Sequence, residues 1–415
     1  MSEFGKIEKH IASLLVQHPK IKNRLKLAYQ KINHIVYRKP YTFKLAKGVY
    51  MKRLLESNDL GDFWGYYDSS PILEQNFLTH SFNQMEREAS FTTQLDILVN
   101  GSKVSETNAW NWQQGSRLFW IDTDTIVHNV YIHDSYKSKI LYLKTRKQRF
   151  LDTPIYAYHR KSKVALGLNF KRLGHLDRAY GYFAHKKDKV SQFDDQRDGI
   201  FKIDTAKNIK ELIISFDTLK TFHAKPYMHK AIHGINHIQI SPSANRFMFL
   251  HRTYLGNGQK FSRLITADLD GSNLHLLSDD DMVSHCNWKN DHEIIGWMHK
   301  NESGDGYYLH KDQTNHFEQL GCGILKEDGH PSFSACGKYM ITDTYPDRSR
   351  MSHVLLYDLI KKRLSVIGSF YTPIQFNNEK RCDLHPRFSD DGNISIDTVH
   401  EGVRHQVQLD ISKIL

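Results

Sequence analysis

The sequence predicts an all-β fold, a seven-bladed β-propeller preceded by a basic N-terminal helical arm. One short pattern, His-x-x-apolar, occurs four times in the C-terminal half, at spacings of 48, 45 and 55 residues. An apolar strand that ends in Asp follows each copy by about 25 to 31 residues. A repeat of this length, built from short strands, is typical of a propeller blade. The copies are HIQIS from His237, HCNWK from His285, HPSFS from His330 and HPRFS from His385.

Three weaker repeats precede these four. They start near Gly65, Asn111 and Thr153, at a spacing of about 43 residues, which suits one four-stranded blade. The third repeat is stretched to about 80 residues, and we expect its extra segment, between Phe170 and Lys230, to lie over one mouth of the central channel. The sequence therefore predicts two parts, an arm over residues 1–56 and a propeller over residues 60–415.

The composition favours a β-rich globular protein inside the cell. Aromatic residues make up 12% of the 415 residues, enough for a sizeable core. No run of 18 apolar residues predicts a membrane-spanning helix, and the N-terminal segment lacks the apolar core of a secretory signal. The four cysteines have no CxxC spacing. We therefore expect a reduced, cytoplasmic protein.

The positive charge is concentrated in the arm. Residues 1–56 hold 13 Lys and Arg against three Glu, whereas the rest of the chain is nearly neutral. Apolar residues are spaced for a helix from about Lys6 to Val36, which Pro19 should kink or divide. A basic amphipathic helix can lie on an anionic membrane surface, contact a polysaccharide-assembly partner, or pack against the propeller. We expect no nucleic-acid binding, because no binding motif accompanies the charge.

The four histidines are candidates for one shared site. Equivalent positions of successive blades lie around one channel, so we expect the four imidazoles to converge on a metal or proton-transfer site. The alternative is structural: each histidine could simply bond the backbone of a neighbouring blade. Four copies in register favour function, because a packing role would accept Asn, Ser or Thr in some blades.

Three segments carry a resemblance to a known family: NHIQISPSANRFMFLHR, GHPSFSACGKYMITDTYPD and DLHPRFSDDGNISIDTVHEG. The chain resembles the oligogalacturonate lyases, seven-bladed propellers that cleave uronate-containing oligosaccharides by β-elimination. It looks still closer to propellers of that superfamily from bacterial surface-polysaccharide gene clusters. The resemblance covers most of residues 60–415 and leaves out the arm. The HPxFSxxGK element is shared with many TolB-like propellers.

The resemblance implies a divalent metal, typically manganese, held by histidines and a glutamine, together with a histidine that acts as base. Matched by motif, His285, His330 and His385 are the candidate metal ligands and His237 is the candidate catalytic base. Gln375, in the loop before His385, is the candidate glutamine.

Three further residues are candidates for binding an acidic substrate. Arg252 follows His251 at the end of a predicted strand and could hold a carboxylate, which places it with His237 in the catalytic set. Tyr345 and Arg348 lie in the segment DTYPDRSR and could touch the substrate or cap their own loop.

Three functions remain open at this point. The first is a metal-dependent lyase or related carbohydrate-active enzyme that acts on an acidic, uronate-containing glycan. The second is a non-catalytic propeller that binds glycan or protein in a cytoplasmic-side polysaccharide assembly system, with the arm placing it at the inner membrane. The third is a peptidase-associated TolB-like propeller. The third is disfavoured because the chain has no GxSxG motif and no room for a hydrolase domain.

Overall fold

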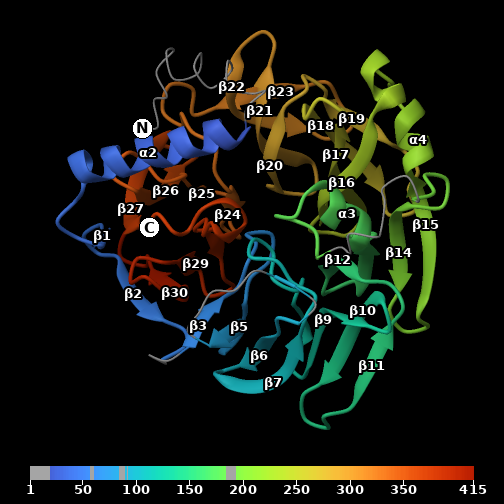
Figure 1. The fold of residues 1–415 in the computed structure, drawn as a ribbon, viewed down its shortest axis with the longest axis horizontal. Coiled ribbons are helices and arrows are strands. Elements are labelled where there is room, and N and C mark those ends of the chain that lie inside the picture. The colour runs from blue at the N-terminus through green and yellow to red at the C-terminus, as the bar shows by residue number, and fades with distance from the viewer. Residues whose placement is uncertain (1–18, 57–59, 84–88, 91, 184–192) are drawn as a thin grey trace.

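Short strands rich in β-branched and aromatic residues, joined by tight turns, form seven antiparallel sheets in the part of the chain that the structure describes. The computed structural model describes residues 19–56, 60–83, 89–90, 92–183 and 193–415. The sheets are arranged as blades around one central axis (Figure 1). The predicted seven-bladed β-propeller is therefore confirmed.

Blades 1 to 3 come from the first half of the chain. Blade 1 contains β3 (Leu60–Phe63), β4 (Ile72–Leu73), β5 (Asn76–Asn83), β6 (Leu95–Val99) and β7 (Ser102–Thr107). Blade 2 contains β8 (Phe119–Asp122), β9 (Thr125–Ile132), β10 (Ser135–Tyr142) and β11 (Gln148–Leu151). Blade 3 contains β12 (Ile155–His159), β13 (Val164–Gly167), β14 (Gly199–Asp204) and β15 (Ile209–Ser215).

Blades 4 to 7 follow. Blade 4 contains β16 (Ile232–Ile240), β17 (Arg246–Tyr254), β18 (Lys260–Asp268) and β19 (His275–Ser278). Blade 5 contains β20 (Val283–Trp288), β21 (Glu293–Lys300), β22 (Gly304–Lys311) and β23 (Phe317–Leu320). Blade 6 contains β24 (Ser332–Phe333), β25 (Tyr339–Asp343), β26 (Met351–Asp358) and β27 (Arg363–Tyr371). Blade 7 contains β28 (Arg387–Phe388), β29 (Ile394–Thr398) and β30 (His405–Asp410).

The hydrophobic core lies between neighbouring blades. Between blades 4 and 5, for example, Met248 and Leu250 of β17 pack in one cluster with Val283 and Trp288 of β20. Because each blade is covered on both faces, its middle strands are buried along almost their whole length, as β17 is. This packing fixes the angle between blades and thereby positions the residues at the centre.

Two short strands from the N-terminal region complete the last two blades. β1 (Phe43–Leu45) pairs with β27 of blade 6, and β2 (Tyr50–Arg53) pairs with β30 of blade 7. Val49, between them, is buried in the core cluster of these blades. Both strands fall within the predicted arm of residues 1–56. They belong to the propeller instead, and they join the N-terminal region to the last blade of the ring.

The helical part of the arm is α2 (Pro19–Tyr37), which starts at the proline that was expected to divide the helix. The predicted segment from Lys6 to residue 18 lies outside the described residues. α2 lies across blade 6 (Figure 1), where the ring of His34 stacks on Tyr371 at 5.3 Å. Of the helices the structure describes, none is both long and apolar enough to cross a membrane.

The predicted insertion in the third repeat contains most of the remaining helical structure. Its helices are α3 (Phe170–Leu176), α4 (Phe216–Thr221) and the 3-10 turn η2 (Pro226–Lys230). A further 3-10 turn, η3 (Asn378–Lys380), precedes blade 7. α3 lies near the centre of the ring in Figure 1. The same segment also contains β14 and β15, the two outer strands of blade 3, so the extra segment predicted between Phe170 and Lys230 was too long.

We predict that β2 is required for stability and that α2 is not. Deletion of residues 1–54 exposes the edge of β30 and removes Val49, whose burial contributes about 1.5–3 kcal/mol. This variant should melt several degrees below the full chain in thermal denaturation. Deletion of residues 1–37 keeps both strands and should melt close to the full chain. Equal melting temperatures for the two deletions would contradict this account of ring closure.

Candidate functional site

The four repeat histidines meet at the centre of the propeller. The ring centroid of His285 lies 5.7 Å from that of His237 and 4.1 Å from that of His330. The ring of His330 in turn lies 4.2 Å from that of His385. Each of the four residues is only 1–2% exposed. The blades thus bring together the residues that the repeat pattern singled out, while their individual chemical roles stay predictions.

Irregular backbone at these positions turns the side chains toward the centre. The register of β16 with β17 shifts at His237, and the register of β20 with β21 shifts at His285. A bulge of this kind redirects a side chain out of the regular alternation. His237 and His385 also have positive φ angles, of 54° and 45°. Such angles are uncommon for non-glycine residues.

Asp343, the last residue of β25, holds two of the histidines. Its Oδ1 accepts a hydrogen bond from the backbone N of His330 at 2.8 Å and lies 2.8 Å from Nδ1 of the same residue. Its Oδ2 accepts from the backbone N of His385 at 3.0 Å. Burial lowers the pKa of His330, but the Asp343 carboxylate outweighs burial and raises that pKa above its usual value. One buried carboxylate therefore joins blades 6 and 7 and orients the ring of His330.

The hydrogen bonds at Nδ1 determine which nitrogen is free. Nδ1 of His385 lies 2.6 Å from the carbonyl oxygen of Gly65, and Nδ1 of His285 lies 3.0 Å from Oδ1 of Asp328. These oxygens only accept, so each Nδ1 donates and the lone pair of the neutral ring remains on Nε2. In the described part of the chain, Nε2 of His330 and Nε2 of His385 are buried and have no hydrogen-bond partner.

Gly65 is constrained by its position beside His385. Its φ is 119°, and a Cβ there would lie 2.8 Å from the carbonyl carbon of Gln114. Only glycine fits this conformation and this close approach. The carbonyl that orients His385 therefore depends on a glycine in blade 1.

Burial keeps most of this cluster uncharged. Burial, reinforced by Arg252, lowers the pKa of His237 well below its usual range. Burial, reinforced by His330, does the same to the pKa of His385. Burial also lowers the pKa of His285, against the attraction of a nearby carboxylate. Neutral imidazole is the form that binds a metal or accepts a proton, and these three rings hold that form at physiological pH.

Asp383 adds a carboxylate to the cluster. One ligand atom from each of His330, Asp383 and His385 lies within 4.8 Å of the others. Burial raises the pKa of Asp383, but Arg381, whose Nε donates to Oδ2 at 2.7 Å, outweighs burial, and the pKa of Asp383 falls below its usual value. Two imidazoles and an ionised carboxylate suit a divalent first-row metal. With two Nε2 atoms unpartnered in the described residues, this donor set fits the metal that the resemblance implies, and His330, whose pKa is raised, would bind it by giving up a proton.

Tyrosines from two distant segments pack against the histidines. The ring of Tyr66 lies 5.3 Å from His237 and 5.0 Å from His385. The ring of Tyr180, from the insertion in blade 3, lies 4.9 Å from His237. These contacts keep water away from the rings and contribute to the lowered pKa values.

A pocket of about 450 Å³ opens beside His285, and Arg252, Lys260 and Tyr345 also line it. Arg252 is 7% exposed, and its Nε donates to Oδ1 of Asn236 at 2.8 Å. Within the described residues, the Arg252 guanidinium takes part in no ion pair. A buried guanidinium with free donors is suited to bind a carboxylate.

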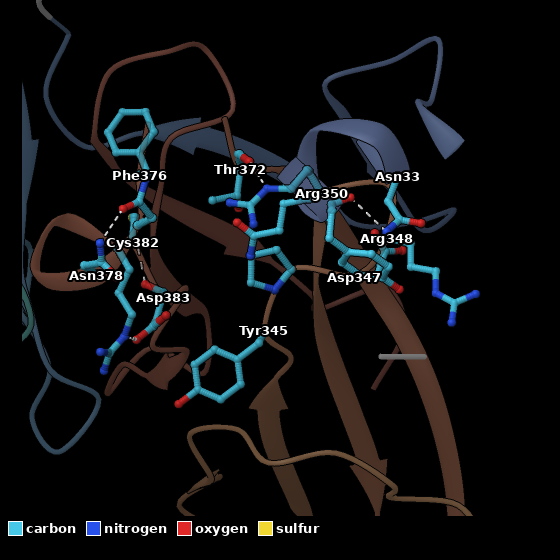
Figure 2. Close-up of a pocket in the computed structure, with 15 residues that line it drawn as sticks. Asn33, Tyr345, Asp347, Arg348, Arg350, Thr372, Phe376, Asn378, Cys382 and Asp383 are labelled. Carbon is cyan, nitrogen blue, oxygen red and sulfur yellow. Dashed lines mark hydrogen bonds and ion pairs between the residues drawn. The ribbon is translucent and has the colours of Figure 1, made fainter. Parts of the chain in front are cut away.

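A second pocket, of about 340 Å³, lies between α2 and the loops of blades 6 and 7 (Figure 2). Tyr345 and Arg348, the two predicted substrate contacts, both line it. Figure 2 shows their side chains pointing to different sides of this pocket. The ring of Tyr345 lies 6.1 Å from His330, and Tyr345 also lines the first pocket. Arg348 is not among the residues that line the first pocket, so the structure brings Tyr345, but not Arg348, to the histidines.

The expected glutamine ligand is not where the sequence placed it. Gln375 is exposed, because its loop turns the next residue, Phe376, into the protein instead. Two buried glutamines, Gln113 and Gln114, lie in the segment that opens the second repeat. Each has an Oε1 that is buried and has no hydrogen-bond partner in the described residues. Nε2 of Gln113 donates to the carbonyl oxygen of Arg381, two residues before Asp383.

Several residues of the site are not among those that the sequence predicted. Asp383 lies in the DLHPRF segment, two residues before a predicted ligand, and that proximity could have identified it. Tyr66 lies at the start of the first weak repeat, equivalent in order to the histidines. Asp343 has a counterpart in Asp397 of the next blade, which the repeat pattern could have shown. Tyr180 carried no repeat signal, because the contact that places it joins segments far apart in sequence.

Comparisons with known proteins agree with this architecture. No protein-family model matches the chain, and no curated protein matches its sequence. The solved structure of an oligogalacturonate lyase from Vibrio parahaemolyticus matches with a TM-score of 0.60 at 12% identity, over 89% of this chain and 96% of that chain. The tricorn protease matches with a TM-score of 0.50 at 10% identity, over 88% of this chain and 34% of that chain. TolB from Acinetobacter baumannii matches with a TM-score of 0.40 at 12% identity, over 78% of each chain. At 12% identity, the property that this chain shares with the oligogalacturonate lyase is the fold, a seven-bladed propeller.

Proposed function

We propose that this protein is a metal-dependent, lyase-like carbohydrate-active enzyme that cleaves an acidic, uronate-containing glycan by β-elimination. One observation carries the proposal. Buried imidazoles with unpartnered nitrogens lie beside a pocket that contains a guanidinium without an ion pair. The imidazoles can bind a metal ion and transfer a proton. The guanidinium can bind the carboxylate of a uronate.

His330, His385 and Asp383 would hold the metal, with His285 adjacent. We propose manganese, because imidazole and carboxylate ligands together suit it and the resembled lyases typically use it. When bound, a divalent metal supplies Lewis-acid stabilisation of the negative charge that develops on the substrate carboxylate. Asp343 and the carbonyl of Gly65 orient the two ligand rings through their Nδ1 atoms.

The pocket residues would bind and orient the substrate. Arg252 presents free guanidinium donors to a carboxylate, and Lys260, which already pairs with Asp177 at 3.3 Å, is a second cation at the same pocket. Tyr345 lies between this pocket and the second one, so a chain of several sugars could extend past it toward α2. Binding by two cations fixes the uronate carboxylate and thereby the carbon atom next to it.

β-Elimination requires a base that removes the proton from that carbon, after which the C–O bond at the neighbouring carbon breaks and a double bond forms. His237 is the proposed base, because both of its ring nitrogens lack hydrogen-bond partners in the described residues and its lowered pKa keeps it neutral. His285 is the competing candidate, because it lines the pocket beside Arg252 and its Nδ1 faces Asp328.

A second candidate function is a non-catalytic propeller that binds glycan or protein. The specific observation in its favour is that Asp383 is already paired with Arg381, which reduces the negative charge available to a metal. The two functions differ in whether the cluster binds a metal and whether a product forms.

We predict that the protein binds Mn²⁺ at the histidine cluster. In isothermal titration calorimetry, His330→Ala should abolish binding, and Asp343→Asn should weaken it by about 10- to 100-fold, since partners of metal ligands have effects of that size. His159→Ala removes an imidazole at the end of β12, where it bonds Ser162 and the carbonyl of Pro242 and lies outside the cluster, and should bind like the unchanged protein. If His330→Ala binds Mn²⁺ as well as the unchanged protein does, the histidine cluster is not the metal site.

We predict that incubation with a uronate-containing glycan yields an unsaturated product that absorbs in the ultraviolet, and that a chelator suppresses it. His237→Ala should lower the rate by about 10²–10⁴-fold, the usual contribution of a general base. Metal content measured on the same sample separates the roles: a base variant keeps the metal, and a ligand variant loses it. If His285→Ala keeps the metal and loses activity while His237→Ala remains active, His285 is the base. If no acidic glycan yields product although Mn²⁺ binds, the binding function replaces the lyase.

We predict that Arg252 recognises the substrate carboxylate. A hydrogen bond to a charged group contributes about 1.5–3 kcal/mol, so Arg252→Gln should lower kcat/KM roughly 10- to 150-fold without changing Mn²⁺ affinity. Arg348→Gln removes a charge from the second pocket and is the matched control. An equal or larger loss in the control would place carboxylate recognition in the second pocket instead.

A further inference from the structure

α2 packs on the propeller through its polar side. Tyr29, Gln30 and Asn33 line the second pocket, and Nε2 of His34 lies 3.2 Å from the hydroxyl of Tyr371. All four of these helix residues are half-buried. The contact with the propeller is therefore made by polar and aromatic groups, the reverse of an ordinary surface helix, which buries its apolar side.

The opposite side of α2 is apolar and exposed. Leu25, Ile32, Ile35 and Val36 are 51%, 63%, 77% and 67% exposed, and Ala28 is exposed as well. Their spacing places them on one stripe of the helix. Four large aliphatic side chains on one exposed stripe are more than scattered surface residues, and such a surface usually has a partner.

The charge around this stripe identifies the kind of partner. α2 contains five Lys and Arg and no Asp or Glu, and no acidic residue occurs from Pro19 to Leu55, against eleven basic ones. A second copy of this chain would bring two strongly positive helices together, which costs free energy. An anionic bilayer offers both an apolar layer and a negative surface to the same helix.

We propose that α2 binds the surface of an anionic lipid bilayer, with its exposed apolar stripe inserted among the headgroups and its polar side kept on the propeller. This inference does not rest on the proposed catalytic function. α2 lines the same pocket as Tyr345, Arg381 and Asp383, so the histidine end of the propeller is held beside the bilayer. An acidic glycan attached to that membrane would then lie within reach of the second pocket.

Vesicle co-sedimentation of the full chain tests the proposal. The protein should bind vesicles of phosphatidylglycerol and phosphatidylcholine, and much less phosphatidylcholine alone, and added salt should weaken binding. The double variant I32D/I35D should bind the anionic vesicles at least about tenfold more weakly, because binding scales with buried apolar area. The double variant I209D/I360D makes the same change at two isoleucines outside α2, which are 58% and 72% exposed. Its affinity for the anionic vesicles should fall only by the effect of two added negative charges.

Two results would overturn the proposal. In the vesicle experiment, the proposal fails if the full chain does not bind anionic vesicles or if the two double variants bind them equally. In light scattering, it fails if the full chain is a dimer that I32D/I35D converts to a monomer, since a second copy would then cover the stripe. Melting temperatures close to that of the unchanged protein show that both double variants remain folded, because all four side chains are exposed.

Discussion

The site depends on one buried carboxylate, that of Asp343. It accepts backbone hydrogen bonds from His330 in its own blade and from His385 in the next, so the two rings keep their separation only while blades 6 and 7 keep their angle. Comparable contacts join other blades: Asp397 accepts from the backbone of blade 1, and the Asn129 side chain bonds the start of blade 3. Without such a partner, each buried donor would cost about 1–3 kcal/mol. These contacts make the central geometry a property of the whole ring.

These hydrogen bonds between blades explain how a cluster of unpartnered polar atoms can persist at the centre. Buried nitrogens without hydrogen bonds and histidines at positive φ are each unfavourable, and they survive where surrounding packing enforces them. The packing is supplied by cores between the blades and by Tyr66 and Tyr180 against the rings. The adjoining pocket carries the unpaired Arg252, and α2 covers the edge of the second pocket. The histidine cluster, Arg252 and α2 thus lie at one end of the ring. Metal binding, anion recognition and membrane contact would all take place there.

The sequence predicted the ring and the four histidines because both follow from a repeat, which translates directly into equivalent positions around an axis. It did not predict β1 and β2, since strands of three and four residues are too short to carry a clear pattern and pair with residues more than 300 positions away. Asp383 was missed because only the histidines were compared between repeats, although Asp328 holds the same position, two residues before His330. Gln375 was chosen from its nearness in sequence to His385, but its loop buries Phe376 and exposes the amide. Distances across the centre depend on the packing of all seven blades, and local patterns do not contain them.

We propose above all that the repeat histidines contribute to a metal site. Anomalous diffraction from crystals of the protein grown with Mn²⁺, recorded at wavelengths on both sides of the manganese absorption edge, tests it most directly. The account predicts one strong anomalous peak bounded by Nε2 of His330, Nε2 of His385 and the carboxylate of Asp383, at bond lengths of about 2.0–2.3 Å. A peak elsewhere on the protein, or an electron-density map without manganese at the cluster, would contradict it.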